Sequence, residues 1–450
     1  MSLLSDEDET FLKDLNQNLT HGPLEPGDPR YVAFESLPEA KDTVGLDNVR
    51  LLERYIKRSA PGRMVYLNGL RGCGKSTQLL RLRQNLKDAG YAAVRIDLMD
   101  YLYPDQPPEI TEFLFYLAGG IADAVVAAGF APNKGRAGGL WHSLTEWLKG
   151  LPPRFDIQTQ ATGTIAVPMP LGLDLDVDIR AALREDAAFV AKLRRFLDGR
   201  LQVLEDQVNR HVGHIAEEVR KASSTTGRGA KGLVVLVDSI DHVRGRDFKA
   251  TRDALHTLLV SNSDLIRLKD CWTVMVIPPY VRPGVPGERR CVNVRVSSPN
   301  SSDPYRPGID ALKQLVSLRV PNGETSRFLE DSQLERLIGL SGGSIRDLMR
   351  LLIEIELQTD ELPASNDTIE RSIQAVRQQF LPLADDVREC LRRVASRHDI
   401  GLESEDEGWE QIFSLLSRHM ILGYPNHEEW YDIHPLLRPY LDGEDGEDGE

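Results

Sequence analysis

The chain has 450 residues, of which 41% are hydrophobic and 27% are charged. These values lie near the average for soluble globular proteins, so neither wholesale disorder nor a fibrous repeat is indicated. The formal net charge is -15, and the acidity is concentrated in residues 1–30 and 401–450. The four cysteines lie far apart and form no CxxC pair, which argues against a disulfide framework and against a cysteine zinc site.

The N-terminus is acidic where a signal peptide would be basic and then apolar. No uninterrupted apolar run approaches the roughly 18 residues that a membrane span needs. We therefore expect a cytoplasmic protein in a reducing compartment, with no membrane partner.

Composition and periodicity divide the chain into five predicted parts. Residues 1–42 are dense in Pro and Gly near their end and are interpreted as an N-terminal arm or linker. Residues 43–305 form an α/β core, and residues 306–382 are helical throughout. In residues 383–440 two short strands follow helices, an order compatible with a winged helix. Residues 441–450 are a Gly-interrupted acidic tail that is too polar to pack.

The core begins with a βαβ unit. A helical pattern at about 43–60 leads into an apolar strand at 64–68, and a helix at 76–89 is followed by a second strand at 92–97. This order predicts a parallel sheet.

A Gly-rich loop connects the first strand to the second helix. Its sequence GLRGCGKS matches the pattern GxxxxGK[ST] in full and lies between a predicted strand and a predicted helix, a context that argues against a chance Gly-rich turn. The backbone N–H groups of such a loop wrap phosphate at a helix N-terminus. The residues expected to bind ATP, or a related nucleoside triphosphate, are Gly69, Gly72, Cys73, Gly74, Lys75, Ser76 and Thr77. We expect Lys75, otherwise exposed, to reach the β- and γ-phosphates and Ser76 to ligate Mg²⁺.

An insertion at about 150–230 interrupts the core after a helix at 108–128. Alternation over residues 154–180 predicts a β-hairpin, and the apolar spacing over 183–222 predicts one long helix with a single apolar face. Two candidate metal sites in this insertion are rejected. Four acidic residues match positions 1, 3, 5 and 12 of a calcium-binding loop: Asp174, Asp176, Asp178 and Glu185. Position 6 of that loop needs Gly and is Ile179 in this chain. His211 and His214 have no third ligand at a suitable spacing.

The most apolar predicted strand, 233–237, ends at Asp238. A P-loop needs an acidic group at the end of such a strand to hold the metal, so Asp238 is the expected partner of Ser76 across Mg²⁺. The alternative is an Asp that only caps a helix. A helix at 247–260 and strands at 272–277 and 292–296 complete the core.

Three blocks together resemble a known family: the P-loop, the strand LVVLVDSIDHV, and the segment SGGSIRDL at 341–348. They are similar to the AAA+ ATPases, in the branch of the origin-recognition proteins, the STAND signalling ATPases and their bacterial relatives. The resemblance covers about residues 40–380. It implies an α/β fold with a parallel-sheet P-loop core, a helical lid and a C-terminal winged-helix-like module. It also implies that Arg346 touches the γ-phosphate from the lid; the alternative is a surface Arg in the first turn of a helix.

The sequence departs from this family in two respects. Members that hydrolyse ATP briskly carry Glu after the metal-binding Asp, but Ser239 stands there, and Asp241 is the nearest carboxylate. The strand ending near 274–279 offers no polar sensor residue. Together these departures predict slow hydrolysis. Spacing does not decide which residue is an arginine finger among three candidates: Arg282, Arg289 and Arg290.

The first functional hypothesis is a slow nucleotide-dependent switch that assembles or controls a protein partner, an effector or a neighbouring subunit of an ATP-dependent homo-oligomer. The resemblance points to bacterial signalling or anti-phage defence by analogy. The alternative is a nucleic-acid-loading or DNA-binding ATPase similar to origin-recognition or transposition regulators. A metabolic kinase is disfavoured by the chain length and by the helical lid.

The C-terminal module bears on this choice. Residues 401–450 contain only Arg418 and Arg438 as basic residues, whereas a DNA-reading helix is basic. This favours a protein contact through Tyr424, Trp430 and Tyr431. The alternative, equally weighted, is that Trp430 closes the core of its own module.

Overall fold

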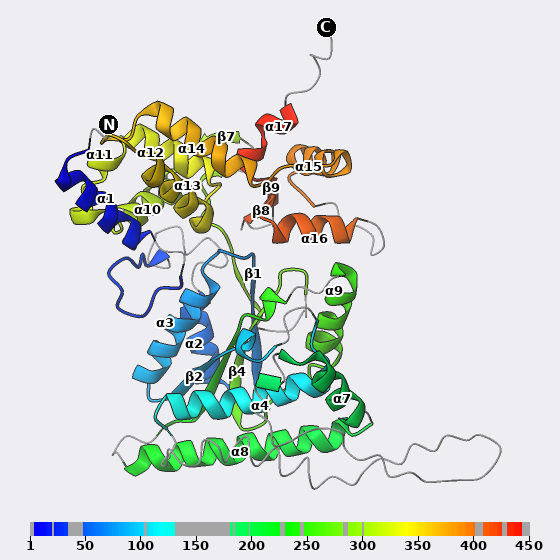
Figure 1. Ribbon diagram of the computed structural model, residues 1–450. Coiled ribbons are helices and arrows are strands. Elements are labelled where there is room, and N and C mark those ends of the chain that lie inside the picture. The colour runs from blue at the N-terminus through cyan, green and yellow to red at the C-terminus, as the bar shows by residue number, and fades with distance from the viewer. Residues whose placement is uncertain are drawn as a thin grey trace. The chain divides into compact units, whose positions relative to one another are not determined.

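The structure is a computed structural model (Figure 1). It describes residues 4–19, 22–34, 48–102, 106–130, 181–182, 185–197, 199–225, 230–243, 247–281, 287–298, 301–400, 408–424 and 430–442. The chain divides into two compact units, which are treated separately. The sheet unit comprises residues 52–67 and 82–288, and the P-loop unit comprises residues 1–51, 68–81 and 289–450.

A five-stranded sheet has the order β2-β3-β4-β1-β5. Its strands are β1 (Met64–Gly69), β2 (Ala92–Asp97), β3 (Leu233–Asp238), β4 (Cys271–Ile277) and β5 (Arg289–Cys291). Strands β2, β3 and β4 pair in parallel, as predicted. All six residues of β3 are buried, which explains why its sequence is a continuous apolar run and not an alternating one.

Helices of the sheet unit cover these strands. They are α4 (Ile110–Ala127), α7 (Ala187–Leu197), α8 (Leu201–Thr225) and α9 (Phe248–His256), with two short 3₁₀ helices, η3 (Leu98–Asp100) and η4 (Ile240–His242), and a π-helical segment, η5 (Thr257–Ser261). In Figure 1, α4 and α8 lie side by side; α4 packs on β2, and α8 packs against β3 and β4. By length and composition, α4 alone among the described helices could cross a membrane. However, 72% of that window is buried, as in a core helix.

The predicted long helix at 183–222 is two helices. Gly199, with φ of 67°, lies between α7 and α8, and the Arg200 N–H donates to the Leu197 carbonyl oxygen. A left-handed Gly ends a helix at low cost, so the backbone breaks although the apolar face continues from Leu193 to Val208. The predicted hairpin at 154–180 lies outside the described residues.

Helices dominate the P-loop unit. Two of them, α2 (Asn48–Arg58) and α3 (Lys75–Asp88), extend into the sheet unit. The others up to residue 378 are α1 (Asp6–Asn18), α10 (Arg306–Ser317), α11 (Thr325–Phe328), α12 (Asp331–Leu340), α13 (Ile345–Gln358) and α14 (Asn366–Gln378), with turn η6 (Pro321–Gly323). Helix α13 packs against α12 and α14.

The N-terminal arm is not irregular as predicted. Helix α1 begins with a capping box at Ser5 and buries Phe11, Leu12 and Leu15. It packs on α13, and Arg327 forms an ion pair with Asp8. The prediction missed this helix because the Pro- and Gly-rich stretch at about 21–30, which follows the helix, was taken to describe the whole arm.

The strand predicted at 292–296 is also absent. Two of its residues, Val294 and Val296, are buried, but the Val294 N–H donates to the carbonyl oxygen of Gly343 and not to a strand of the sheet. The alternating apolar side chains are buried, as the pattern predicts, but the backbone N–H of Val294 pairs with a loop residue and not with a strand. Beyond it, β6 (Ser297–Ser298) and β7 (Ser301–Pro304) pair antiparallel.

The C-terminal residues contain α15 (Asp385–Arg397), α16 (Trp409–Ser417), β8 (Ile421–Tyr424), β9 (Trp430–Ile433), η7 (Pro435–Leu437) and α17 (Pro439–Asp442). Strands β8 and β9 form an antiparallel pair after the helices. The rings of Tyr424 and Trp430 stack with centroids 4.4 Å apart, and both side chains are buried. The expectation that these two contact a protein partner is therefore wrong; Trp430 closes a local core. The acidic tail from residue 443 lies outside the described residues.

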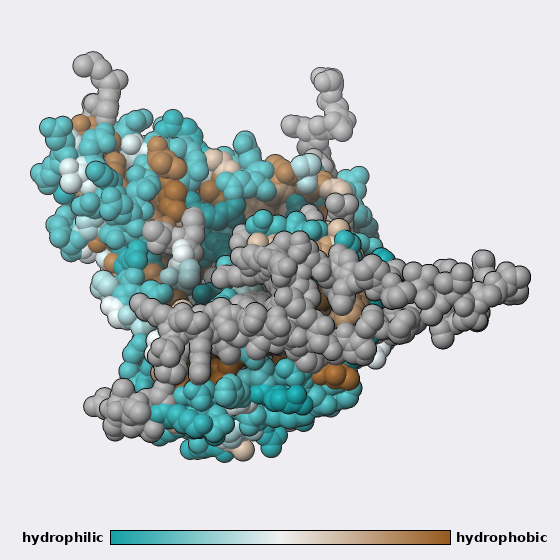
Figure 2. Space-filling model, turned by 60° about the horizontal axis from the view of Figure 1, so that its bottom comes forward, coloured by the Kyte–Doolittle hydropathy of each residue, from teal (hydrophilic) through white to brown (hydrophobic). Residues whose placement is uncertain are grey.

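The visible surface is mainly polar. On the face shown in Figure 2, the residues that are not grey are mostly hydrophilic, and apolar residues form small separate groups. Among the described residues, the exposed large apolar side chains are Val203, Leu318 and Leu357, which lie far apart in the sequence. This pattern agrees with the charged composition of the chain.

Candidate functional site

Three glycines shape the loop between β1 and α3. Gly69, Gly72 and Gly74 have φ values of 154°, 89° and 86°. A Cβ built on Gly69 would lie 2.5 Å from the carbonyl oxygen of Cys291, which no side chain tolerates. A Cβ built on Gly74 would meet nothing within 4 Å, so the loop is open there. Positive-φ glycines directly before a 14-residue helix are the backbone pattern from which anion-binding nests are built in proteins.

The ammonium group of Lys75 lies inside this loop. Its Nζ donates to the carbonyl oxygens of Gly69 (2.9 Å) and Leu70 (2.7 Å), and the residue is only 6% exposed. The expectation of an exposed lysine is therefore wrong. The cause is that two carbonyl oxygens of the loop compensate the buried charge. The positive charge is held inside the Gly-rich loop.

The other predicted loop residues have different surroundings. The Cys73 thiol is buried and donates to the Leu70 carbonyl oxygen at 2.9 Å. The Thr77 hydroxyl accepts the backbone N–H of Leu24 at 3.3 Å, so the N-terminal arm touches the first turn of α3. Ser76 is half-buried in that turn. Its hydroxyl is the kind of oxygen ligand that Mg²⁺ accepts beside phosphates.

Arg346 of α13 lies against the loop. Ser344 caps this helix, and Arg346 is its second residue. A Cβ built on Gly72 would lie 3.0 Å from the Arg346 Cβ and 3.2 Å from its Nε. Burial, and then the nearby Arg71 guanidinium, lower the pKa of Arg346. The two positive charges therefore repel each other.

His419 also lies against Gly72, and sequence reasoning missed it. A Cβ built on Gly72 would lie 3.1 Å from its Cε1. The residue is 6% exposed, with φ of 60°. No motif includes His419, and only the tertiary fold brings it to the loop.

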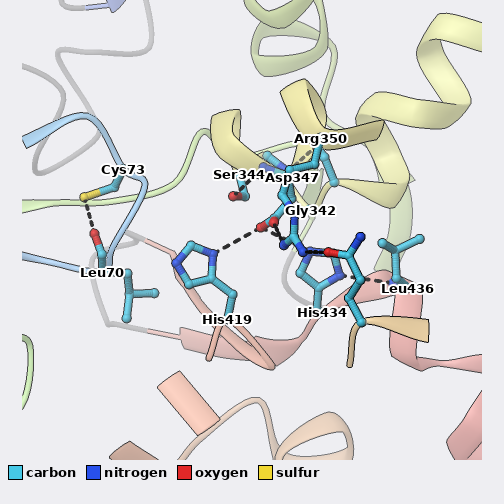
Figure 3. Close-up of polar contacts among 12 residues, drawn as sticks. Leu70, Cys73, Gly342, Ser344, Asp347, Arg350, His419, His434 and Leu436 are labelled. Atoms are coloured by element: carbon cyan, nitrogen blue, oxygen red, sulfur yellow. Dashed lines mark hydrogen bonds and ion pairs between the residues drawn. The ribbon is translucent and has the colours of Figure 1, made fainter. Parts of the chain in front are cut away.

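Asp347, directly after Arg346, links these elements (Figure 3). Its carboxylate is fully buried and lies 3.1 Å from His419 Nδ1, 3.5 Å from His434 Nε2 and 2.9 Å from the Arg350 guanidinium. Burial alone would raise the pKa of Asp347, but the His419 hydrogen bond and the nearby His434 imidazole outweigh burial and hold the pKa well below its usual value. We call Asp347, Arg350, His419 and His434 the Asp347 cluster. It joins α13 to the segments before β8 and after β9.

Asp238 ends β3 in the sheet unit, and its partner was not predicted. Its Oδ2 accepts hydrogen bonds from Arg95 Nε at 3.0 Å and Nη2 at 2.6 Å, while its Oδ1 accepts the Ser239 N–H at 2.9 Å. Arg95 Nη2 also lies 3.1 Å from Asp97. Ser239 is buried with φ of 72°, and Asp241 follows in η4, half-buried.

The other candidates gain no support. Arg289 and Arg290 are half-buried in β5, and Arg282 lies outside the described residues, as do the predicted calcium-loop residues 174–178. His211 and His214 lie on α8, and burial lowers the pKa of His211 to about 4. Within the described ranges, no group of three His, Cys, Asp or Glu side chains could hold a metal ion.

No family model matches the chain, and no curated protein matches it. Among solved structures, the fold is similar to a Walker-type ATPase of Pyrococcus abyssi, with a TM-score of 0.43 and 12% sequence identity. The alignment covers 95% of this chain and 100% of that one.

Proposed function

We propose that the chain binds ATP, or a closely related nucleoside triphosphate, in the loop 69–76 and acts as a slow nucleotide-dependent switch. One observation carries the proposal. Gly72, in the middle of a complete P-loop sequence, packs against Arg346 of α13 and His419 of the C-terminal segment. A phosphate group in the loop would therefore be adjacent to two other elements of the same unit.

The loop is suited to bind phosphate with little rearrangement. The Lys75 ammonium would exchange its bonds to two carbonyl oxygens for bonds to phosphate oxygens, which are stronger because both partners are charged. The backbone N–H groups that the positive-φ glycines turn inward would hold the β-phosphate. Among the described residues, the Arg346 guanidinium makes no hydrogen bond, so its donors remain available to a γ-phosphate.

Of the two residues expected to ligate Mg²⁺, Ser76 is suited to this role and Asp238 is not. The Ser76 hydroxyl lies in the first turn of α3 and would hold the ion beside the phosphates, where Mg²⁺ neutralises phosphate charge. Asp238 does not fit as it stands, because its Oδ2 is already occupied by two donors of Arg95. We derive no step through a metal at Asp238.

Slow turnover is part of the proposal. Ser239 cannot take a proton from water as a carboxylate can. The sequence suggests that Ser239→Glu would raise turnover, but the left-handed backbone and burial of Ser239 argue against this remedy. A Glu there would be strained and would put a second charge beside Asp238. Asp241 remains the nearest carboxylate in the sequence and would be a slow substitute base.

The Asp347 cluster suggests how binding could be transmitted. It connects the helix that carries Arg346 with both histidines of the C-terminal segment, so a shift of Arg346 toward a phosphate group would pull on that segment. The switch would control a protein effector or a neighbouring subunit, in a cytoplasmic signalling or defence role that rests on analogy alone.

The test is the loss of binding in Lys75→Ala. Removing the ammonium should weaken ATP binding at least ~100-fold, corresponding to about 3 kcal/mol. Calorimetry measures the affinity, and a melting curve checks that the variant folds. Lys87→Ala, in the last turn of the same helix, is the matched control and should bind normally. Unchanged affinity in a folded Lys75→Ala protein would remove the proposal. Wild-type turnover well below the ~10 per second of a typical enzyme is expected in the same preparation.

One observation favours a second candidate, a nucleic-acid-loading ATPase. Helix α15 carries Arg388, Arg392, Arg393 and Arg397, and it precedes a helix and a two-stranded sheet, the order of a winged helix. Basic residues supply most of the affinity for nucleic acid. Acidic residues in the first turn and at Glu389 offset this charge, so we rank the candidate second.

A further inference from the structure

Two carboxylates end neighbouring strands in the sheet unit, and one arginine lies between them. The register of β2 and β3 pairs Asp97 with Asp238. Arg95 is two residues before Asp97, so its side chain leaves the same face of β2. Its guanidinium reaches Asp238 at 2.6 Å and Asp97 at 3.1 Å. The arginine thereby neutralises two like charges that strand pairing forces together.

We propose that Arg95 is a built-in counter-cation of Asp238 that competes with divalent cations for this carboxylate. Asp238 becomes available to Mg²⁺ only when the guanidinium withdraws. The consequence for nucleotide binding rests on the proposed function, but the competition itself concerns only Arg95, Asp97 and Asp238.

The geometry of the pair makes the two cations mutually exclusive. Both donors of Arg95 bind the same Oδ2, which uses both of its lone pairs, and Oδ1 already accepts the Ser239 N–H. Mg²⁺ demands near-octahedral oxygen ligands at about 2.1 Å and would have to share the carboxylate with a positive group in contact with it. Asp238 is 2% exposed, so water screens this repulsion poorly.

Loss of a proton from Arg95 does not release the carboxylate. Burial lowers the pKa of Arg95, but the charges of Asp238 and Asp97 outweigh burial and raise it above the usual arginine value. The guanidinium stays charged at every physiological pH, so its withdrawal requires a conformational change. Its side chain is 22% exposed, which leaves a path toward solvent.

The first experiment needs no nucleotide. Arg95→Gln leaves Asp97 and Asp238 as adjacent uncompensated carboxylates, and millimolar Mg²⁺ should then raise the melting temperature of the variant by at least ~3 °C. Mg²⁺ should leave the wild-type melting temperature unchanged. Arg194→Gln is the matched control: Arg194 also bridges a buried carboxylate, that of Glu112, and a more exposed one, that of Glu109, but these two lie at the N-terminus of a helix and not at paired strand ends.

Two outcomes would overturn the proposal. One is a wild-type protein that Mg²⁺ stabilises as much as the variant. The other is a folded Arg95→Gln protein that responds no more than Arg194→Gln. If Arg95→Gln does not fold, Arg95→Met decides the question. Methionine removes the charge and keeps an apolar stem, so stabilisation by Mg²⁺ supports the competition and no response contradicts it.

A second experiment separates this proposal from the nucleotide-binding function. The ratio of the ATP affinities measured with Mg²⁺ and with a chelator should be at least ~3-fold larger in Arg95→Gln than in the wild type, because only the variant leaves Asp238 free to bind the ion. A wild type that binds no ATP would refute the proposed function and leave the melting test of Arg95 intact. A strong Mg²⁺ dependence in the wild type that Asp238→Asn abolishes would refute the competition.

Discussion

At the scale of single residues, Asp347 is a fully buried charge in the P-loop unit. Its buried carboxylate makes hydrogen bonds with His419 and Arg350 and lies 3.5 Å from His434 Nε2, and these three side chains together compensate its desolvation. Removing one partner of a buried charged group is costly because the remaining partners lose their compensation. The side chains of the Asp347 cluster should therefore be more sensitive to substitution than the many exposed ion pairs.

We expect Asp347→Asn to lower the free energy of unfolding by about 3 kcal/mol near neutral pH. Because the pKa of Asp347 is depressed in the folded state, its stabilisation is fully present above the unfolded value of about 3.9 and is lost as pH falls below it. The difference in the free energy of unfolding between the wild type and Asp347→Asn should therefore become smaller in acid. Urea unfolding at neutral and acidic pH measures it.

Asp331→Asn is the matched control for this prediction. The Asp331 side chain is 77% exposed and pairs with Lys313, so its loss should change stability by less than ~1 kcal/mol. A difference between wild type and Asp347→Asn that does not vary with pH would contradict the role assigned to the ionised carboxylate.

At the scale of elements, the start of α13 is fixed by a backbone contact. Gly343 has φ of 75°, its carbonyl oxygen accepts the Val294 N–H, and a Cβ built on it would lie 1.7 Å from the Val294 carbonyl oxygen. A side chain at this position is excluded both by conformation and by space. The contact sets where α13 begins and therefore where Arg346 lies.

Gly343→Ala should lower the free energy of unfolding by about 3 kcal/mol or more. Gly339→Ala, four residues earlier in α12, is the control. No atom lies within 4 Å of its built Cβ, so alanine should stabilise the helix by about 0.5–1 kcal/mol. Chemical denaturation of both variants tests the pair. If both substitutions changed the free energy of unfolding equally, the backbone contact at Gly343 would not be what fixes the start of α13.

The sequence predicted most elements but not their exact limits. The strands at 64–68, 92–97, 233–237 and 272–277 were predictable because buried parallel strands are continuous apolar runs. The break at Gly199 was missed because the apolar spacing continues across it. The strand at 292–296 was wrong because alternation reports burial and not the identity of the backbone partner.

At the scale of the whole molecule, charge discriminates between the two candidate functions. The chain carries a net charge of -15, although α15 presents exposed arginines. Binding to a random DNA duplex should therefore be weaker than a Kd of ~10⁻⁴ M at physiological salt, the weak limit of ordinary non-specific binders. Fluorescence anisotropy at two salt concentrations measures this.

Tighter binding that falls steeply with salt would contradict the prediction and favour the nucleic-acid candidate. The double variant Arg393→Glu with Arg397→Glu then shows whether α15 is responsible, because both side chains are exposed and charge reversal should abolish phosphate contacts. Binding that survives this reversal would exclude α15 as the contact surface.

The sequence by itself determined the local features of this protein: the Gly-rich loop, the apolar strands around it, the helical pattern after residue 306 and the absence of a general-base carboxylate at Ser239. Each depends on residues that are close in the chain. Only the tertiary structure decided the partners of the charged groups. Arg95 reaches Asp238 across 143 residues, and His419 reaches Asp347 across 72. Strand register and helix packing select such contacts, and neither leaves a periodic signal in the sequence.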